Sequence, residues 1–512
     1  MGQQINAIEL KNITKRFGKV VANDKVCLSV RNGEILSILG ENGSGKTTLM
    51  NMLSGIYFPD EGQIFVEGRE VTIKSPKDSF ALGIGMIHQH FKLVDVLTAA
   101  ENIILGLPGK EILDMQEVVQ KITELVERYG FELNPNQKIY EMSVSQKQTV
   151  EIIKVLYRGA GILILDEPTA VLTPQETDKL FAVLRNMRAD GRSIIIITHK
   201  LHEVLALSDR VSVLRKGQYI GTVNTCEATA ESLTEMMVGK KVSLDIDRPE
   251  PVNPVKRLEV NGLSCVNKEG VPTLSDATFT AYSGEILGIA GIAGSGQKEL
   301  LEAIAGLQPT CAGAVTYYPP EGEAEVITEK SAAEIRKMGI RLSFVPEDRL
   351  GMGLVGSMDM TDNMMLRGYN KGKGLFVDRK TPKSLAESII EKLEVVTPGV
   401  STPVRRLSGG NVQKVLVGRE ISSSPTVLMV AYPVRGLDIN SSYTIYHLLN
   451  EQKQQGVAVL CVGEDLDVLL ELCDKILVLC GGRISGIVDA RTATKEEVGL
   501  LMTKTGKEET HE

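Results

Sequence analysis

An internal repeat constrains this chain more than any other feature. The stretch NGEILSILGENGSGKTTL begins at Asn32 and resembles SGEILGIAGIAGSGQKEL, which begins at Ser283; 283 minus 32 gives an offset of 251 residues. Repetition has to be recognised before single motifs are interpreted, because every motif then has a counterpart. A chain of 512 residues also exceeds what one hydrophobic core ordinarily supports. We therefore expect two copies of one domain.

The segment between the copies, VSLDIDRPEPVNPVK, has the composition of a linker. It covers residues 242–256 and contains Pro249, Pro251 and Pro254 among alternating charges. Because proline has no backbone N–H group, these residues disfavour a helix or a central strand. The predicted organisation is a first domain over residues 1–241, a proline-rich linker over 242–256 and a second domain over 257–512.

Each copy has the pattern of an α/β domain. Short β-rich strands lead to a glycine loop that opens a helix, and a more helical middle precedes further apolar strands. In the middle of the first copy, apolar residues recur at helical spacing and predict an amphipathic helix. These residues are Ile112, Met115, Val119, Ile122 and Val126. We expect a mixed sheet around the glycine loop and a helical subdomain in each copy.

The glycine loop of the first copy predicts a phosphate site. GENGSGKT, from Gly40 to Thr47, fits the pattern G-x-x-x-x-G-K-[ST] and follows the apolar strand Glu34 to Leu39. The backbone N–H groups of such a loop converge on phosphate oxygens at the positive end of a helix. Lys46 would reach the β- and γ-phosphates, and Thr47 would bind magnesium; the alternative is a glycine-rich turn that matches by chance. The predicted nucleotide contacts are Gly40, Glu41, Asn42, Gly43, Ser44, Gly45, Lys46, Thr47 and Thr48.

A later strand ends in side chains that hydrolysis requires. The apolar strand Ile162 to Leu165 precedes Asp166 and Glu167, at the end of the strand where α/β sheets bind ligands. Asp166 would hold magnesium, and Glu167 would orient or deprotonate the attacking water. On its own, an Asp–Glu pair at a strand end is more often a solvated turn.

His199 and Gln89 occupy similar strand-end positions. His199 follows the strand of SIIIITHK and can hydrogen-bond a γ-phosphate, although a lone histidine usually has a structural role. Gln89, in GMIHQHFKLV, follows a short strand and is a candidate for both the catalytic and the magnesium-binding set. Its neighbours His88 and His90 are interpreted as packing or surface residues rather than metal ligands.

Together these residues resemble the ATP-binding cassette (ABC) family, in the form with two fused nucleotide-binding domains. The resemblance covers nearly the whole chain. It implies two tandem P-loop cassettes with ATP and Mg²⁺ as cofactors, and catalytic roles for Lys46, Glu167, His199 and Gln89. Phe17 in TKRFGKV would stack on adenine, Gln89 would be the glutamine that senses a permease, and His199 would be the switch histidine. A core aromatic is an equally good explanation of Phe17.

The family's signature sequence, LSGGQ, is better preserved in the second copy. LSGGN at residues 407–411 is nearly the full motif, whereas MSVSQ at residues 142–146 has valine and serine in place of the two glycines, which blocks close approach to a phosphate. The resemblance implies that Ser408, Gly409 and Gly410 cap the γ-phosphate bound by the opposite domain when the two halves pair head to tail.

The phosphate machinery shows the opposite asymmetry. The second copy lacks the cation, the hydroxyl and the acidic residues at the aligned positions. The aligned pairs are Gln297 with Lys46, Lys298 with Thr47, Ala431 with Asp166, Tyr432 with Glu167, Gly463 with His199 and Glu347 with Gln89. No group of the second copy is then expected to hold magnesium or to activate water.

A further turn fits the same division. It reads AVLT in the first copy and RGLD in the second, so that Asp438 stands where the first copy has Thr173. In the family this aspartate reaches across to the partner's site. The intact phosphate loop of the first copy and the intact signature and aspartate of the second copy thus belong to one composite site. Losses that occurred independently in the two copies would not be sorted in this way. We expect one site that hydrolyses ATP and one that only closes.

Charge and hydropathy limit the partners. The net charge is −8, which argues against a nucleic-acid binder because such proteins need a basic surface. Apolar runs such as Ile194 to Ile197 are strand-sized, so the chain is not expected to cross a membrane by itself. The start MGQQINAIEL lacks a signal-peptide pattern, and Asn6 stands where myristoylation requires Ser or Thr. The seven cysteines show no CxxC spacing, and we expect reduced, mostly buried thiols.

The resemblance extends to a class of transporter. Fused cassettes with one silent site resemble the ATPase subunits of bacterial importers, which act at the cytoplasmic face of the cell membrane with separate transmembrane permease subunits and a substrate-binding lipoprotein. GMIHQHFKLV, YRGAGILILDEPTAVLTPQE and Gln297 are most similar to the nucleoside branch. Sugar importers of the ribose and galactose type are the alternative. A rival class is a soluble tandem-cassette ATPase that acts on ribosomes or DNA; such proteins usually keep both sites intact.

Overall fold

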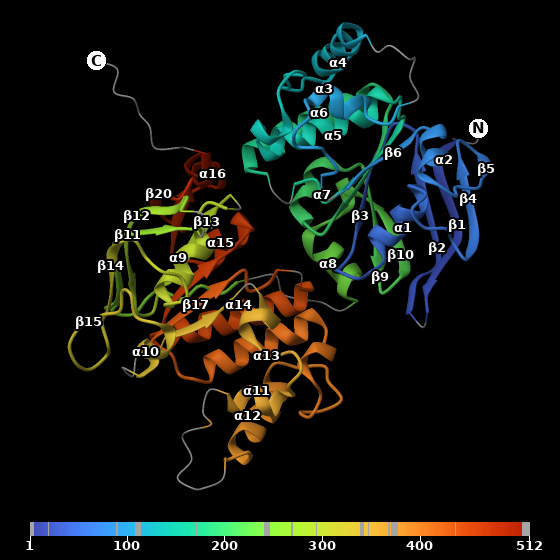
Figure 1. Ribbon diagram of the computed structural model, residues 1–512. Helices are drawn as coiled ribbons and strands as arrows, with labels where there is room; N and C mark the ends of the chain where they lie inside the picture. Colours follow the sequence, from blue (N-terminus) through green and yellow to red (C-terminus); the bar gives the residue numbers. More distant parts are fainter. Residues whose placement is uncertain are drawn as a thin grey trace, which may run out of the picture. The chain divides into compact units, whose positions relative to one another are not determined.

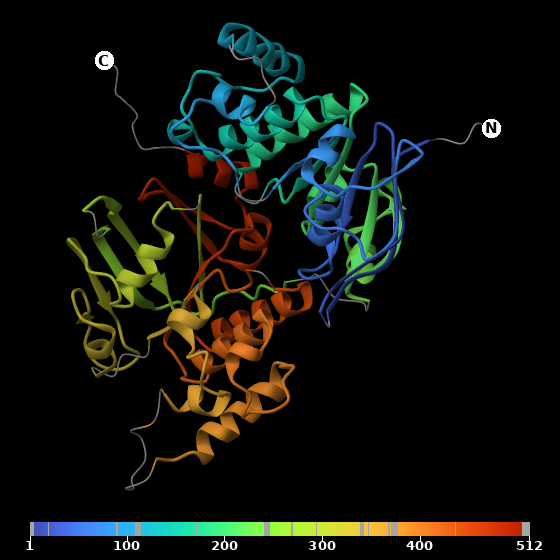
Figure 2. The same ribbon diagram turned by 45° about the vertical axis from the view of Figure 1, so that its right-hand side comes forward.

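The computed structural model describes residues 5–503 apart from 19, 89–90, 108–113, 170–171, 240–245, 268–269, 293, 338–341, 347, 367–368, 370–376 and 436. The chain divides into two compact units, Met1–Ser243 and Leu244–Glu512. Figure 1 colours the first unit from blue to green and the second from yellow-green to red, and Figure 2 shows the same ribbons after a 45° turn.

The first unit is built on a six-stranded mixed sheet. All neighbouring strands are parallel except the edge strand β10, which runs antiparallel to β9. The strand order is β10 (Gln218–Asn224), β9 (Arg210–Arg215), β3 (Ile35–Leu39), β8 (Ser193–Thr198), β7 (Ile162–Asp166) and β6 (Ile84–Ile87). Strands β3, β7 and β8 are buried at every residue, as expected for parallel strands covered on both faces.

The two faces of this sheet carry different layers. On one face, residues such as Leu36 and Ile195 pack with helix α1 (Lys46–Leu53) and with an antiparallel sheet. On the other face, Ile194 and Leu163 pack against helices, which gather on one side of the sheet in both views. The antiparallel sheet has the order β2 (Val20–Arg31), β1 (Asn6–Phe17), β4 (Glu61–Val66) and β5 (Arg69–Val71). The helices are α3 (Ala99–Ile104), α4 (Met115–Tyr129), α5 (Val144–Tyr157) and α6 (Pro174–Ala189).

Helix α4 confirms the predicted amphipathic helix and most of its predicted apolar face, including Ile122, Val126 and the partly buried Val119. The buried side chains are Val118, Ile122, Val126 and Tyr129, whereas Met115 is exposed. Predicted Ile112 lies outside the described residues.

The second unit repeats this architecture. Its larger sheet has the order β20 (Arg483–Asp489), β19 (Lys475–Cys480), β13 (Ile286–Gly291), β18 (Ala458–Val462), β17 (Val427–Ala431) and β16 (Leu342–Val345). Its antiparallel sheet has the order β12 (Pro272–Tyr282), β11 (Lys256–Val266), β14 (Ala312–Tyr317) and β15 (Glu325–Val326). Because each strand has the same neighbours as its counterpart in the first unit, the predicted repeat and α/β fold are confirmed.

The helices of the second unit also follow those of the first. The π-helix η3 (Arg349–Gly353) comes after β16, and the α-helices of this unit occur in the same order as those of the first. In the second unit they are α9 (Gln297–Ile304), α10 (Ala332–Lys337), α11 (Met360–Met365), α12 (Lys380–Lys392), α13 (Gly409–Ile421), α14 (Ile439–Gln454), α15 (Leu466–Leu472) and α16 (Lys495–Thr503). The first unit further contains α2 (Pro76–Ala81), α7 (Leu201–Leu207) and α8 (Ala230–Val238). Among the described residues, no helix is both long and apolar enough to span a bilayer.

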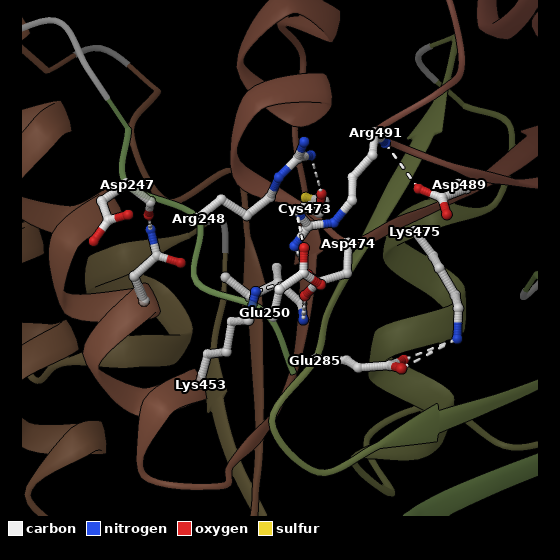
Figure 3. A network of polar contacts seen from close by, with 12 residues as sticks. Asp247, Arg248, Glu250, Glu285, Lys453, Cys473, Asp474, Lys475, Asp489 and Arg491 are labelled. Atoms are coloured by element: carbon white, nitrogen blue, oxygen red, sulfur yellow. Dashed lines mark hydrogen bonds and ion pairs between the residues drawn. The ribbon is translucent and has the colours of Figure 1, made fainter. Parts of the chain in front are cut away.

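Residues 246–255 of the predicted linker, here called the strap, are bound to the second unit. The Arg248 guanidinium donates to the carbonyl oxygens of Leu470 and Cys473, each at 2.7 Å, at the end of α15. The carbonyl of Asp247 accepts a hydrogen bond from Asn450 Nδ2 on α14. Figure 3 shows these contacts side by side. The strap therefore ties together the ends of two helices of the second unit.

The strap lies beside a buried ion pair. Lys453 Nζ and Asp474 Oδ1 are 2.7 Å apart, and their side chains are only 1% and 6% exposed. Asp474 also accepts from the backbone N–H of Ile286 at the start of β13, at 2.8 Å. Arg491 contacts both Asp474 and Glu250 of the strap (Figure 3).

The first unit has an exposed version of the same pair. Arg188 and Asp209 are 2.6 Å apart, and Asp209 accepts from the N–H of Ile35 at the start of β3. Their side chains are 45% and 27% exposed. Both units therefore have this ion pair at equivalent positions, but only the second unit buries it.

The cysteines differ from expectation. Fewer than half of them are buried, so the prediction of mostly buried thiols is wrong. Cys265, Cys461 and Cys473 are buried, Cys480 is intermediate, and Cys27, Cys226 and Cys311 are exposed.

Candidate functional site

Three neighbouring parallel strands of the first unit bring the predicted residues together. The glycine loop follows β3, Asp166 ends β7, and His199 follows β8, which lies between β3 and β7. The carboxyl ends of parallel strands meet at one edge of a sheet. The structure therefore places Lys46, Asp166, Glu167 and His199 at a single edge.

Two glycines of the loop are required because neighbouring backbone lies too close for a side chain. Gly45 has φ +94°, and a Cβ there would lie 2.3 Å from the carbonyl oxygen of Ala22. A Cβ on Gly40 would lie 2.3 Å from the carbonyl oxygen of Leu214. The loop is thus held between β2 and β9 while its outer residues, Asn42 and Gly43, are exposed.

Two polar side chains inside the loop are suited to a phosphate. Lys46 is 6% exposed and its Nζ donates to the carbonyl oxygens of Gly40 at 2.6 Å and Glu41 at 3.0 Å. Burial lowers the pKa of Lys46, and the charges of Glu167 and Asp166 oppose that shift. The hydroxyl of Ser44 is buried and has no hydrogen-bond partner among the described residues. A buried cation and an unpartnered buried hydroxyl at a helix N-terminus fit an anionic ligand.

The predicted metal ligands Thr47 and Asp166 lie next to each other. The Thr47 hydroxyl lies close enough to the Asp166 carboxylate to lower its pKa. Burial, and then the negative charge of Glu167, raise the pKa of Asp166 to about 6. A hydroxyl and a carboxylate are oxygen donors of the type that Mg²⁺ prefers, and a nearby cation would offset the cost of burying this charge. The residues present therefore fit a magnesium ion. Thr48, the next residue, is half-buried on α1.

Glu167 and His199 form a hydrogen-bonded pair. His199 Nδ1 lies 2.8 Å from Glu167 Oε1. This hydrogen bond lowers the pKa of Glu167, so that its carboxylate is charged and able to accept a proton. Glu167 has φ +47°, and its N–H donates to the carbonyl of Ile197. Tyr432 of the second unit has φ +48° and the equivalent bond to Val462, so this strained turn belongs to the repeat rather than to catalysis.

Phe17 is available for a ligand. It ends β1, is 44% exposed, and contacts Tyr57 edge to face with ring centroids 5.2 Å apart. The core-aromatic explanation of Phe17 is therefore wrong. Sequence reasoning missed Tyr57, because no motif links it to Phe17. Gln89, His90 and Glu347 lie outside the described residues, and His88 is half-buried.

The signature of the second unit lies beside Asp438. Ser408 is the N-cap of α13, and its Oγ accepts from Asn411 N at 3.4 Å and Asn411 Nδ2 at 2.8 Å. Both acceptor positions are then in use, which leaves the hydroxyl hydrogen free to donate. A Cβ on Gly410 would lie 3.6 Å from Asp438 Oδ2. Asp438 caps α14 and binds the N–H and hydroxyl of Ser441.

The degraded signature of the first unit keeps only its structural role. Ser143 is the N-cap of α5 and forms a capping box with Gln146. Thr173 is the N-cap of α6, bonded to Glu176, and is 1% exposed. Serine and threonine at these positions stabilise their helices without the glycines that would admit a phosphate.

The glycine loop of the second unit has the same backbone conformation as the first but lacks the lysine charge. Gly296 has φ +99°, close to the value of Gly45. Gln297 is buried, and its Nε2 donates to the carbonyl of Ile292 at 3.0 Å, as Lys46 does to Glu41. Lys298 instead points to Glu302 on the surface of α9.

The strand register corrects one aligned pair. Ile35 pairs with Ile194, and Ile286 with Val459, so β18 residues are numbered 265 above their β8 counterparts (459 minus 194). The counterpart of His199 is therefore Glu464, and the prediction of Gly463 is wrong by one residue.

The second unit therefore does hold a carboxylate at this edge, which the sequence comparison overlooked. Glu464 Oε1 forms an ion pair with Arg435 Nε at 3.0 Å. The Arg435 guanidinium also lies over the ring of Tyr432, the counterpart of Glu167. The carboxylate is thus paired with a cation of its own unit.

Comparison with known proteins agrees with this geometry. A family model described as "ABC transporter" matches residues 23–170 and 274–433, one segment in each repeat. The nucleoside import ATP-binding protein NupA of Lactococcus lactis subsp. cremoris is 43% identical, covering 97% of both chains. The guanosine import ATP-binding protein NupO of Bacillus subtilis is 41% identical, covering 98% of both. The ribose import ATP-binding protein RbsA 1 of Streptomyces avermitilis is 39% identical, covering 98% of this chain and 94% of the other. Two matched repeats and such similarity over nearly the full length show that the chain belongs to the ABC transporter family.

Proposed function

We propose that this chain is the ATP-hydrolysing subunit of a membrane importer and that it hydrolyses Mg²⁺-ATP in its first unit. The observation that carries the proposal is the meeting of Lys46, the Thr47–Asp166 pair and the Glu167–His199 pair at one strand edge. The printed names of the relatives support the importer role.

The residues divide the chemistry among themselves. Lys46 exchanges its bonds to loop carbonyls for phosphate oxygens, and Ser44 donates its free hydroxyl. Thr47 and Asp166, with Gln89, would hold the magnesium ion, which neutralises phosphate charge when bound. Glu167 accepts the proton of the attacking water while His199 fixes the orientation of the carboxylate. Phe17 would stack on the adenine ring.

We infer that the second unit completes this site. Ser408, Gly409, Gly410 and Asp438 would meet the γ-phosphate when the two units pair head to tail. Supporting this, the signature and the aspartate lie side by side in the unit that has lost its own phosphate cation.

Substitutions in the first unit test the hydrolytic site. Lys46→Ala should weaken nucleotide binding by about 1.5 to 3 kcal/mol, the value of hydrogen bonds to charged groups. Glu167→Gln should leave ATP bound but abolish its hydrolysis. Gln297→Ala should change turnover little. Near-normal turnover in Glu167→Gln would refute the assignment.

Two matched substitutions test the shared site. Ser143 and Ser408 are both helix N-caps, so Ser143→Arg and Ser408→Arg each remove one cap and add the same side chain. Ser408→Arg should abolish hydrolysis, whereas Ser143→Arg should reduce it only by hindering closure. The reverse order of severity would mean that each unit uses its own signature.

A nucleoside is the proposed solute, since NupA and NupO are somewhat more similar to this chain than RbsA 1. Deleting the gene should abolish energy-dependent uptake of labelled nucleosides and leave ribose and galactose uptake unchanged. The converse result would favour a sugar importer of the ribose or galactose type.

The proposed partners are transmembrane permease subunits and a substrate-binding lipoprotein, with the chain at the cytoplasmic face of the membrane. Copurification with a polytopic membrane protein tests this. Copurification with ribosomes instead would favour a soluble tandem-cassette ATPase, against which the net charge of −8 argues.

A further inference from the structure

One arginine of the second unit joins two segments that are far apart in the sequence. The guanidinium of Arg349 donates from Nη1 to the carbonyl of Gly409 at 3.3 Å and from Nη2 to the carbonyl of Arg435. Gly409 belongs to the signature, and Arg435 lies three residues before Asp438. A single rigid, planar group therefore fixes the signature against the turn that carries the aspartate.

The local structure is built around this side chain. A Cβ on Gly409 would lie 3.2 Å from Arg349 Nη1, so the glycine leaves room for the guanidinium. Asp348 Oδ1 accepts from the N–H of Gly351 at 2.8 Å and caps the π-helix that Arg349 begins. The arginine is half-buried, and its backbone is held in place by that cap.

The first unit has a different residue at the position equivalent to Arg349. Ile84 pairs with Ile162 and Leu342 with Val427, which places Phe91 at the position of Arg349. A phenyl ring has no hydrogen to donate to a carbonyl. The arginine thus occurs in the unit with the intact signature, and the phenylalanine in the unit with the degraded one.

We propose that Arg349 is a positioning residue for ATP hydrolysis: it holds the signature and Asp438 as one preformed surface for the γ-phosphate. Donors that are fixed before the transition state is reached need no reorganisation during the reaction. The inference rests on the shared site proposed above, since Arg349 acts through Ser408, Gly409, Gly410 and Asp438.

The test uses the full chain, with kcat and KM measured for Mg²⁺-ATP. Arg349→Ala should lower kcat by about tenfold to a hundredfold, the rate equivalent of one hydrogen bond to a charged group. KM should stay within about twofold, because the first unit's loop binds the nucleotide. Arg349→Lys should restore part of kcat, since one ammonium group reaches one carbonyl but not both. Arg379→Ala is the control: it removes an exposed arginine of the same unit, paired with Asp362, and should leave kcat unchanged.

A double-mutant cycle separates positioning from a merely structural role. In a Ser408→Ala background, Arg349→Ala should lower kcat much less than in the natural chain. Equal effects in both backgrounds, or an unchanged kcat in Arg349→Ala, would overturn the inference. If Ser408→Ala itself leaves kcat unchanged, the shared site is wrong instead. Thermal unfolding checks that the variants fold, and Arg349→Gln replaces Arg349→Ala if the alanine variant does not.

Discussion

At the scale of single residues, Asp166 shows a conflict between function and stability. It is 8% exposed, and burial together with Glu167 raises its pKa from 3.8 to about 6. For an acid, a raised folded-state pKa means that the charged form is less stable in the folded chain than in the unfolded one. The penalty is absent below pH 4, grows between pH 4 and 6, and is complete above pH 6.

Removing this charge should therefore stabilise the chain without nucleotide. At pH 8, Asp166→Asn should raise the free energy of unfolding by about 3 kcal/mol. The reason is that the pKa of Asp166 is raised from 3.8 to about 6, and a tenfold change in proton affinity corresponds to about 1.4 kcal/mol. The gain should shrink at pH 5 and vanish near pH 4, and hydrolysis should be lost at every pH. Urea unfolding of both proteins at the three pH values measures this. A variant less stable than the natural chain at pH 8 would contradict it.

Sequence motifs predicted those site residues that are close together in the chain or follow an apolar strand. Lys46 and Asp166 were predicted because glycine and hydrophobic patterns fix their backbone. Tyr57 and Arg349 were not, since their contacts with Phe17 and Gly409 join segments distant in sequence. The one-residue error at Gly463 could have been avoided from the sequence, because the offset of 265 residues that joins Asp166 to Ala431 also places Glu464 opposite His199.

At the scale of elements, the junction between β3 and α1 depends on a glycine for two separate reasons. Gly45 has a positive φ, and its Cα faces the carbonyl of Ala22. A side chain would be strained by the backbone angle and would also collide with β2. Gly159, after α5, has φ +84° but open space around it, so it shows the first effect without the second.

The two glycines make a matched pair of substitutions. Gly159→Ala should cost about 1 to 2 kcal/mol of stability from the left-handed backbone angle alone. Gly45→Ala should cost more and should also abolish nucleotide binding, because the loop has to move. Thermal unfolding and binding of a fluorescent ATP analogue measure both effects. Equal losses in the two variants would show that the contact with Ala22 is unimportant.

At the scale of the whole molecule, the two units carry one ion pair in two environments. Lys453–Asp474 is buried beside the strap, whereas Arg188–Asp209 is partly exposed. The repeat therefore provides an internal comparison of buried and exposed pairs. The repeat and the fold of each unit could be predicted from the sequence, but the attachment of the strap could not. Prolines indicate an extended chain, and they do not tell what Arg248 binds.

Substituting the cation of each pair should show this difference. Lys453→Met leaves a buried carboxylate with fewer partners and should destabilise the second unit by about 3 kcal/mol or more. Arg188→Met should cost less than about 1 kcal/mol, as for exposed ion pairs. Unfolding of the full chain, followed by hydrogen exchange of peptides from each unit, measures both. Comparable losses would mean that burial does not matter here.

The strap also decides how this chain can be divided. A fragment beginning at Lys256 would contain every strand of the second unit, yet it would lack Arg248 and Glu250, which bind the end of α15 and Arg491. A fragment beginning at Leu244 keeps those contacts within one piece. Tags, fluorescent proteins or protease sites inserted at 246–255 would pull apart a folded surface. The prolines of this segment therefore belong to the second cassette and do not mark a free connection.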